Sequence, residues 1–212
     1  SRNEYERGDD LETHAYEWIH TAKPEEIFKM KFDVIIGNPP YQLATGGGTE
    51  ENKSATQARP IYHKFIEQAK KLNPRYIVMI IPARWYSGGM GLNQFRSNML
   101  NDHHIIKLVD YINSKDCFQG VDIAGGICYF LWDRDHPNEK CEVVNISGDS
   151  INSEMRSLNE FETLFIRSNA AIDIIKKVKR QTTHYMNEIV SPIDTFGIPS
   201  KEKGHKEKAD GD

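Results

Sequence analysis

A short apolar run followed by two consecutive prolines limits what this chain can fold into more than any other stretch does. Residues 32–41 read Phe-Asp-Val-Ile-Ile-Gly-Asn-Pro-Pro-Tyr. The Val-Ile-Ile run is typical of a strand buried on both faces of a parallel sheet, and Gly37 allows a sharp turn where the strand ends. The two prolines fix φ at their own positions and restrict the residue before each. The sequence therefore predicts a stiff loop at the carboxyl end of a core strand, where open α/β sheets bind their ligands.

This loop carries groups that suit a planar amine. Proline has no N–H, so the turn presents acceptors, among them the Asn38 side-chain oxygen and the Pro39 carbonyl. An exocyclic or amide nitrogen is a poor nucleophile because its lone pair is conjugated, and two acceptors on its N–H bonds stabilise the positive charge that develops when it reacts. The Tyr41 ring offers a face on which a flat group can stack. We interpret Asn38, Pro39, Pro40 and Tyr41 as catalytic; the alternative is a proline-rich turn that only ends a strand.

Residues Asp33–Tyr41 resemble motif IV of the amino-group methyltransferases that use S-adenosylmethionine. The chain is similar to the gamma-class adenine-specific DNA methyltransferases of restriction–modification systems, from about Gly8 to about Arg134. The resemblance implies methyl transfer to the amino nitrogen of adenine in double-stranded DNA, with the adenine extruded from the duplex to reach Asn38 and Tyr41. Two alternatives stay open: an amino-methyltransferase that acts on RNA or on a protein glutamine, and a non-catalytic DNA-binding remnant.

Composition excludes several other classes. The chain has 212 residues, enough for one domain with a core. A net charge of −4 argues against a uniformly basic nucleic-acid binder, although local basic patches remain compatible with it. No stretch approaches the 18 apolar residues of a membrane span. Cys117, Cys128 and Cys141 are an odd, widely spaced set, which predicts buried thiols in a reducing, cytoplasmic compartment and neither disulfides nor a zinc site.

Hydrophobic periodicity after the loop predicts an α/β chain. Proline, glycine and apolar spacing mark helices over residues 60–72 and 92–100, and strands over residues 76–82, 105–111, 125–132 and 141–146. No crossover helix fits between the strands at 105–111 and 125–132, so these two are predicted to be antiparallel. The resemblance implies a Rossmann-like S-adenosylmethionine-dependent methyltransferase fold, present in part, with a mostly parallel sheet and an antiparallel end.

The cofactor is expected to depend on sequence beyond this chain. Gly8-Asp9-Asp10-Leu11 resembles the family's motif III, which implies that Asp9, Asp10 and Asn38 contact S-adenosylmethionine; the alternative for Asp10 is a helix N-cap. The family's glycine-rich strand–turn does not precede Asn38. We therefore expect the rest of the parent polypeptide to carry that motif, and this chain alone to bind the cofactor poorly and to be inactive.

The resemblance also implies residues that contact DNA. Lys53 and Arg59 follow motif IV in a polar, glycine-containing loop and are expected to contact phosphates; the alternative is a solvated loop. Arg84 and Trp85 follow the strand at 76–82 and are expected to shape the pocket or meet DNA, or else to pack at the strand end. Phe118 is expected near the target base, or as a core anchor.

Three regions are expected along the chain. Residues 1–147 form the carboxyl-terminal part of the methyltransferase catalytic domain. Residues 148–200 form a helical extension, with an amphipathic, basic-ended helix over 169–180, as a possible start of the target-recognition region. Residues 201–212 are charged and of low complexity, which predicts a disordered tail.

Overall fold

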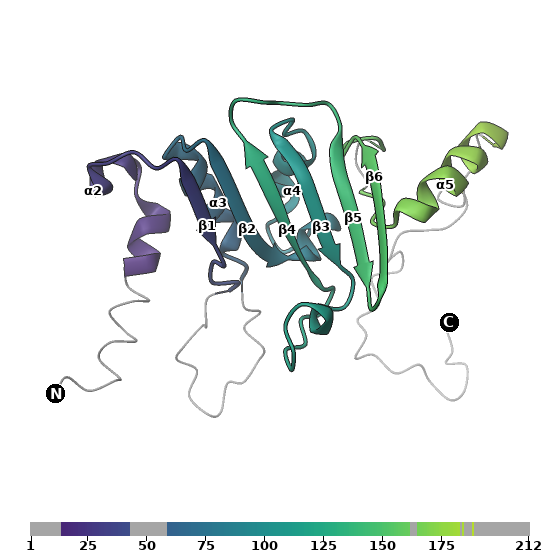
Figure 1. Cartoon of the computed structure of the whole chain (residues 1–212), viewed down its shortest axis with the longest axis horizontal. Coiled ribbons are helices and arrows are strands. Elements are labelled where there is room, and N and C mark those ends of the chain that lie inside the picture. Colours follow the sequence, from purple (N-terminus) through teal and green to yellow (C-terminus); the bar gives the residue numbers. More distant parts are fainter. Residues whose placement is uncertain (1–13, 43–58, 162–164, 183, 185–187, 189–212) are drawn as a thin grey trace, which may run out of the picture. The chain divides into compact units, whose positions relative to one another are not determined.

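A computed structural model describes residues 14–42, 59–161, 165–182, 184 and 188 (Figure 1). The chain divides into two compact units, Ser1–Asn169 and Ala170–Asp212. The first unit contains a six-stranded sheet. The second contains nearly all of helix α5 (Asn169–Gln181), which agrees with the helix predicted over residues 169–180.

The sheet is mixed, and four of its six strands point the same way. In spatial order the strands are β1 (Val34–Gly37), β2 (Tyr76–Pro82), β4 (Ile127–Asp133), β3 (Ile105–Tyr111), β5 (Cys141–Ser147) and β6 (Ser150–Arg156). Two pairs are parallel, β1 with β2 and β3 with β5; β4 is antiparallel to both neighbours, and β6 is antiparallel to β5. The Rossmann-like α/β prediction is confirmed, as is the antiparallel pairing of the third and fourth strands.

The structure shows the position of β4 in the sheet, which the sequence pattern did not predict, and an additional strand, β6. Strand β4 lies between β2 and β3, because the connection over residues 112–126 contains no crossover helix and returns the chain beside β3 (Figure 1). Strand β6 was not predicted: it forms a hairpin with β5 across Gly148, whose φ of 55° is left-handed. The sheet therefore continues beyond residue 147, and the expectation of a helical extension beginning at 148 is wrong in this first part.

Two helices, α3 (Tyr62–Lys71) and α4 (Asn93–Leu100), cover one face of the sheet in the described part of the chain (Figure 1). The helix at residues 14–20 packs on α3 through Trp18 and Phe65, whereas α2 (Glu25–Phe28) has no buried residue. Short 3-10 turns are η2 (Ala83–Tyr86) and η3 (Ser114–Asp116). Figure 1 shows α3 and α4 behind the sheet. In β2 the residues that join the core with these helices, Ile77, Met79 and Ile81, alternate with the half-buried Val78 and Ile80.

Strand β1 differs from its prediction. The side chains of Val34 and Ile36 are 48% and 77% exposed, so the strand is not covered on both faces by described residues. The reason is its position, since β1 is the edge of the sheet and pairs only with β2. Gly37 does not have a positive φ, and a Cβ there would make an ordinary 3.7 Å contact with Met79, so Pro39 and Pro40 rather than Gly37 determine the turn.

Candidate functional site

The Asn-Pro-Pro-Tyr corner lies at the carboxyl end of β1 and is held against the start of α3. Asn38 and Pro40 are exposed, Pro39 is buried and Tyr41 is half-buried. The Tyr41 carbonyl accepts a hydrogen bond from the Ile61 N–H at 3.1 Å, and Gln42 forms a β-bridge with Pro60. These two contacts join the chain at the end of the corner to the chain just before α3.

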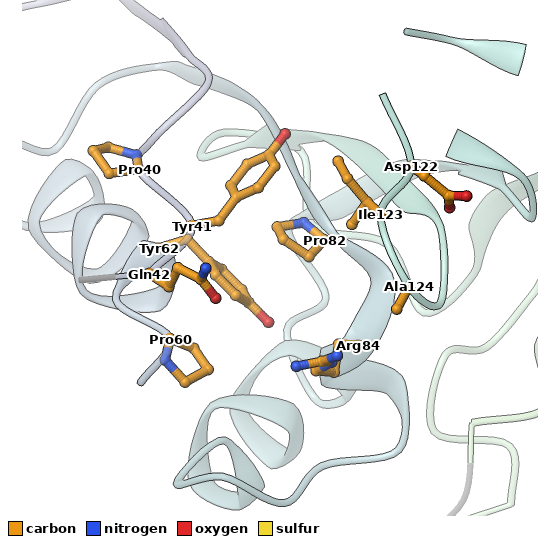
Figure 2. A pocket seen from close by; sticks show the side chains of 10 residues that line it. All are labelled: Pro40, Tyr41, Gln42, Pro60, Tyr62, Pro82, Arg84, Asp122, Ile123 and Ala124. Atoms are coloured by element: carbon orange, nitrogen blue, oxygen red, sulfur yellow. The ribbon is translucent and has the colours of Figure 1, made fainter. Parts of the chain in front are cut away.

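An open cleft of about 590 Å³ lies beside this corner (Figure 2). Four segments that are distant in the sequence form its walls, and they contribute Pro40, Tyr41, Gln42, Pro60, Tyr62, Pro82, Arg84, Asp122, Ile123 and Ala124. They meet because β1 and β2 are parallel and end at the same edge of the sheet. The cleft is of the size that small-molecule and cofactor sites have in proteins.

Tyr41 presents its ring to this cleft. Figure 2 shows the ring projecting toward Pro82 and Ile123. Burial raises the pKa of the Tyr41 phenol, and the neighbouring Asn38 side chain offsets part of that rise. The Tyr41 hydroxyl is buried and has no hydrogen-bond partner among the described residues. The phenol therefore stays neutral at physiological pH and can act as a flat stacking surface.

Arg84 and Trp85 are adjacent in η2 but lie in different environments. Arg84 is exposed, lines the cleft, and donates to the Met90 sulfur at 3.5 Å. Trp85 is completely buried, and its Nε1–H points at the Cys128 sulfur at 3.4 Å. Burial of Trp85 contradicts the prediction that it meets DNA; the alternative of packing at the strand end is what the structure shows, because the indole joins the apolar core.

The remaining predicted residues are only partly brought together. Asp9, Asp10 and Lys53 lie outside the described residues. Arg59 is exposed and immediately precedes Pro60 of the cleft wall. Phe118 is half-buried and does not line the cleft; its connection between β3 and β4 contributes residues 122–124 instead.

Sequence reasoning missed Tyr62, Gln42, Pro82 and the segment 122–124. Apolar spacing in the sequence predicts an inner face of Ile61, Phe65, Ala69 and Leu72 for the helix at 60–72. In the structure the stripe Tyr62, Ile66 and Ala69, at spacings of four and three, is the more deeply buried one. Counting both stripes would have found Tyr62. No local pattern marks residues 122–124, since only the return of the chain across the sheet edge brings them to the cleft.

A buried ion pair holds this return segment in place. Arg167 donates from Nη2 to Asp110 Oδ1 at 2.7 Å and to the Tyr111 carbonyl at 3.1 Å, and from Nη1 to the Gly125 carbonyl at 2.7 Å. Asp110 is fully buried. Burial lowers the pKa of Arg167, but the hydrogen bonds and charge of Asp110 outweigh burial and raise it. Burial raises the pKa of Asp110, and the hydrogen bonds and charge of Arg167 offset part of that rise. These contacts join the end of β3 to the cleft segment.

Of the three residues expected to contact S-adenosylmethionine, only Asn38 is described, and it is exposed at the sheet edge. Within the same residues, no group of three His, Cys, Asp or Glu side chains could hold a metal ion. None of the helices in the described part of the chain has the length and apolar character needed to cross a bilayer.

Comparison with known proteins gives the family. Residues 1–118, which include the Asn38 corner and α3, match the model of the Eco57I restriction-modification methylase. The chain belongs to the Eco57I restriction-modification methylase family. A relative in this comparison, an uncharacterized adenine-specific methylase of Mycoplasma pneumoniae, is 35% identical over 184 residues, which cover 79% of this chain and 43% of the relative. The Eco57I-family chain thus spans less than half the length of that protein.

Solved structures with some similarity to this Eco57I-family chain also come from restriction–modification systems. The type I methyltransferase subunit of Streptococcus thermophilus is 13% identical, with a TM-score of 0.43 over 77% of this chain and 35% of that one. The type IIG restriction endonuclease BpuSI is 14% identical, with a TM-score of 0.43 over 70% of this chain and 22% of that one. At this level of similarity the two structures do not bear on function.

Proposed function

We propose that the complete protein is a DNA methyltransferase of a restriction–modification system that transfers a methyl group to the amino nitrogen of adenine. The observation that carries the proposal is the exposed Asn38 amide beside an open cleft into which the Tyr41 ring projects. Membership of the Eco57I family supports the reaction, and similarity to the adenine-specific methylase of Mycoplasma pneumoniae supports adenine as the target. A DNA substrate implies action in the cytoplasm.

In this proposal the corner activates the amine by accepting its two protons in hydrogen bonds. The Asn38 side-chain oxygen and the Pro39 carbonyl accept from the two N–H bonds, which stabilises the positive charge that builds up on nitrogen. Pro40 keeps the corner rigid, and the extruded adenine stacks on Tyr41. S-adenosylmethionine, when bound, supplies the methyl group.

The rim of the cleft supplies candidates for DNA contact. Arg84 is exposed beside the cleft and has no acidic partner among the described residues, so its charge is available to a phosphate. Arg59, next to Pro60, and Lys53, outside the described residues, remain candidates of the same kind. Phe118 remains a candidate for contact with bases near the target, from the segment between β3 and β4.

We propose that polypeptide outside this sequence completes the sheet beyond β1 and carries the cofactor motif. The β1 edge lies beside an apolar hollow of about 310 Å³ that is lined by Trp18, Phe28, Phe32, Val34, Ile35, Ile36 and Leu72. An exposed edge strand offers unpaired backbone groups to a further strand, and exposed apolar patches mark contact surfaces. The greater length of the Mycoplasma pneumoniae relative is compatible with such a segment. In this proposal the catalytic domain comprises residues 1–147 and continues through β6, and the target-recognition region begins after β6.

The test is methyl transfer by the complete protein from labelled S-adenosylmethionine. We expect labelled N6-methyladenine in unmodified duplex DNA, and no label in RNA or in a protein glutamine. Asn38→Ala should lower kcat at least about 100-fold, because one of two preorganised acceptors is lost. The matched control is Asn98→Ala, which should retain activity. Asn98 is an exposed asparagine whose side-chain oxygen accepts a hydrogen bond from Gln94 at 2.9 Å. An active Asn38→Ala enzyme would contradict the proposal.

A binding measurement tests the part attributed to other polypeptide. In isothermal titration, the complete protein should bind S-adenosylmethionine, while a chain of residues 1–212 that retains its circular-dichroism spectrum should bind it poorly. Micromolar affinity of the 212-residue chain would contradict this division of the cofactor site.

A further inference from the structure

Tyr62 is a polar residue of the cleft that the proposed reaction does not use. Its side chain is 1% exposed, and its hydroxyl is buried without a hydrogen-bond partner among the described residues. Buried polar atoms in proteins are nearly always hydrogen-bonded, so an unpaired one calls for an explanation. The same side chain lines the cleft beside Tyr41 and Arg84.

The ring of Tyr62 is held so that only its hydroxyl end faces the cleft. Phe95 and His63 meet the ring edge-on at centroid distances of 6.0 and 6.1 Å. Figure 2 shows the hydroxyl pointing toward Arg84, away from the direction taken by the Tyr41 hydroxyl. A side chain anchored this way has lost its rotational freedom before any ligand binds, which lowers the entropic cost of a contact.

We propose that the Tyr62 hydroxyl donates a hydrogen bond to a ring nitrogen of the target adenine and helps to position that base. The inference rests on the proposed adenine methyltransferase function. In the proposed reaction the Asn38 side-chain oxygen and the Pro39 carbonyl accept from the amino group, whereas the ring nitrogens of adenine are themselves acceptors and need a donor. Tyr62 supplies such a donor in the same cleft. Burial raises the pKa of the Tyr62 phenol, so its proton remains in place at physiological pH.

Two flexible side chains control access to this hydroxyl. Gln42 and Arg84 are both exposed and line the cleft next to Tyr62, and Figure 2 shows Gln42 alongside the ring and Arg84 beyond the oxygen. Long surface side chains change rotamer on the picosecond-to-nanosecond timescale. Their rotation opens the hydroxyl to a base without movement of the backbone. Tyr62 is therefore a residue of the base-binding wall rather than of the core alone.

The test is Tyr62→Phe in the complete protein, measured on duplexes that carry adenine, 1-deazaadenine, 3-deazaadenine or 7-deazaadenine at the methylated position. Each analogue replaces one ring nitrogen with C–H. We expect kcat/KM on adenine to fall about tenfold, the value of one hydrogen bond, mainly through KM. On one of the three analogues, kcat/KM of the wild type should fall by a similar factor. On that same analogue, kcat/KM of Tyr62→Phe should not fall further, because the same hydrogen bond cannot be lost twice.

Stability and a matched control separate this role from packing. Tyr62→Phe should unfold at the wild-type temperature or above it, since the deleted oxygen has no described partner. The control is Tyr76→Phe, at the opposite end of β2, which should not respond to any analogue. Unchanged kinetics of Tyr62→Phe, an equal loss on all four duplexes, or a clearly lower unfolding temperature would each overturn the inference. Absence of wild-type activity on adenine would instead refute the proposed function on which the inference rests.

Discussion

Gly126 is the position where a single methyl group should do the most damage. Its φ is +78°, and an added Cβ would lie 2.2 Å from the Tyr111 carbonyl oxygen, 2.6 Å from that of Ile112 and 2.8 Å from Arg167 Nη2. Carbon and carbonyl oxygen approach no closer than about 3.3 Å even in favourable contacts. The backbone at Gly126 must therefore move by about 1 Å, away from the end of β3.

The expected cost follows from three contributions. A left-handed conformation costs an alanine about 1 kcal/mol, overpacking costs about 1–3 kcal/mol, and each disturbed hydrogen bond costs about 1 kcal/mol. Two backbone bonds are at risk, from the Ala83 N–H to the Gly126 carbonyl at 3.0 Å and from the Gly126 N–H to the Ile123 carbonyl at 2.9 Å. With both bonds disturbed, Gly126→Ala should therefore lower the free energy of unfolding by about 4–6 kcal/mol.

Gly125→Ala is the matched control. Its φ of +88° carries the same backbone strain, but an added Cβ has no neighbour within 4 Å, so it should cost only about 1 kcal/mol. Urea unfolding of the complete protein, followed by circular dichroism, gives both values. A difference of less than about 1 kcal/mol between the two variants would refute the steric argument at Gly126.

Two further predictions concern the opposite end of the sheet and the thiols. Asp102 accepts hydrogen bonds from Lys70 Nζ, the His104 N–H and Trp132 Nε1; burial favours a higher pKa, but Lys70 and His104 outweigh it and place the pKa of Asp102 below its usual 3.8. Asp102→Ala should lower the free energy of unfolding by about 2–4 kcal/mol in urea at pH 7. The difference between wild type and variant should hold above pH 3.8 and shrink as the pH falls through the lowered pKa of Asp102. A difference that does not depend on pH would contradict this account. Burial raises the pKa of Cys128 and Cys141 to about 12, so a thiol reagent at pH 8 should modify no more than Cys117 in the folded protein and all three thiols in urea, as counted by mass spectrometry. Native modification of Cys128 would show that the core opens more readily than its packing implies.

The sequence predicted the elements whose local pattern matches their environment. The strands at 76–82 and 105–111 have the predicted bounds because apolar runs closed by a proline or a polar segment leave little choice of end point. The Asn38 corner was predicted for the same kind of reason, since two prolines fix the backbone before any tertiary contact forms.

The predictions differ from the structure where tertiary contacts, and not the local sequence pattern, decide whether a residue is buried or lies in a strand. Ile36 sits in an apolar run yet is 77% exposed, because strand order places β1 at the edge. Trp85 sits beside the exposed Arg84 yet is buried, because the turn of η2 directs it toward Cys128. Strand β6 is mostly polar and lacks apolar alternation, so only its hairpin pairing with β5 in the structure reveals it as a strand.

The amino-acid sequence alone determined the rigid corner at Asn38–Tyr41, the family it resembles, and the order of helices and strands from β1 to β5, because these depend on dihedral restriction and on periodicity along the chain. Only the tertiary structure decided which side chains share the cleft. Tyr62, Arg84 and Ile123 come from a helix, a strand end and a connecting segment, and they meet because β4 enters between β2 and β3. Contacts of that kind depend on strand order, which no local pattern encodes.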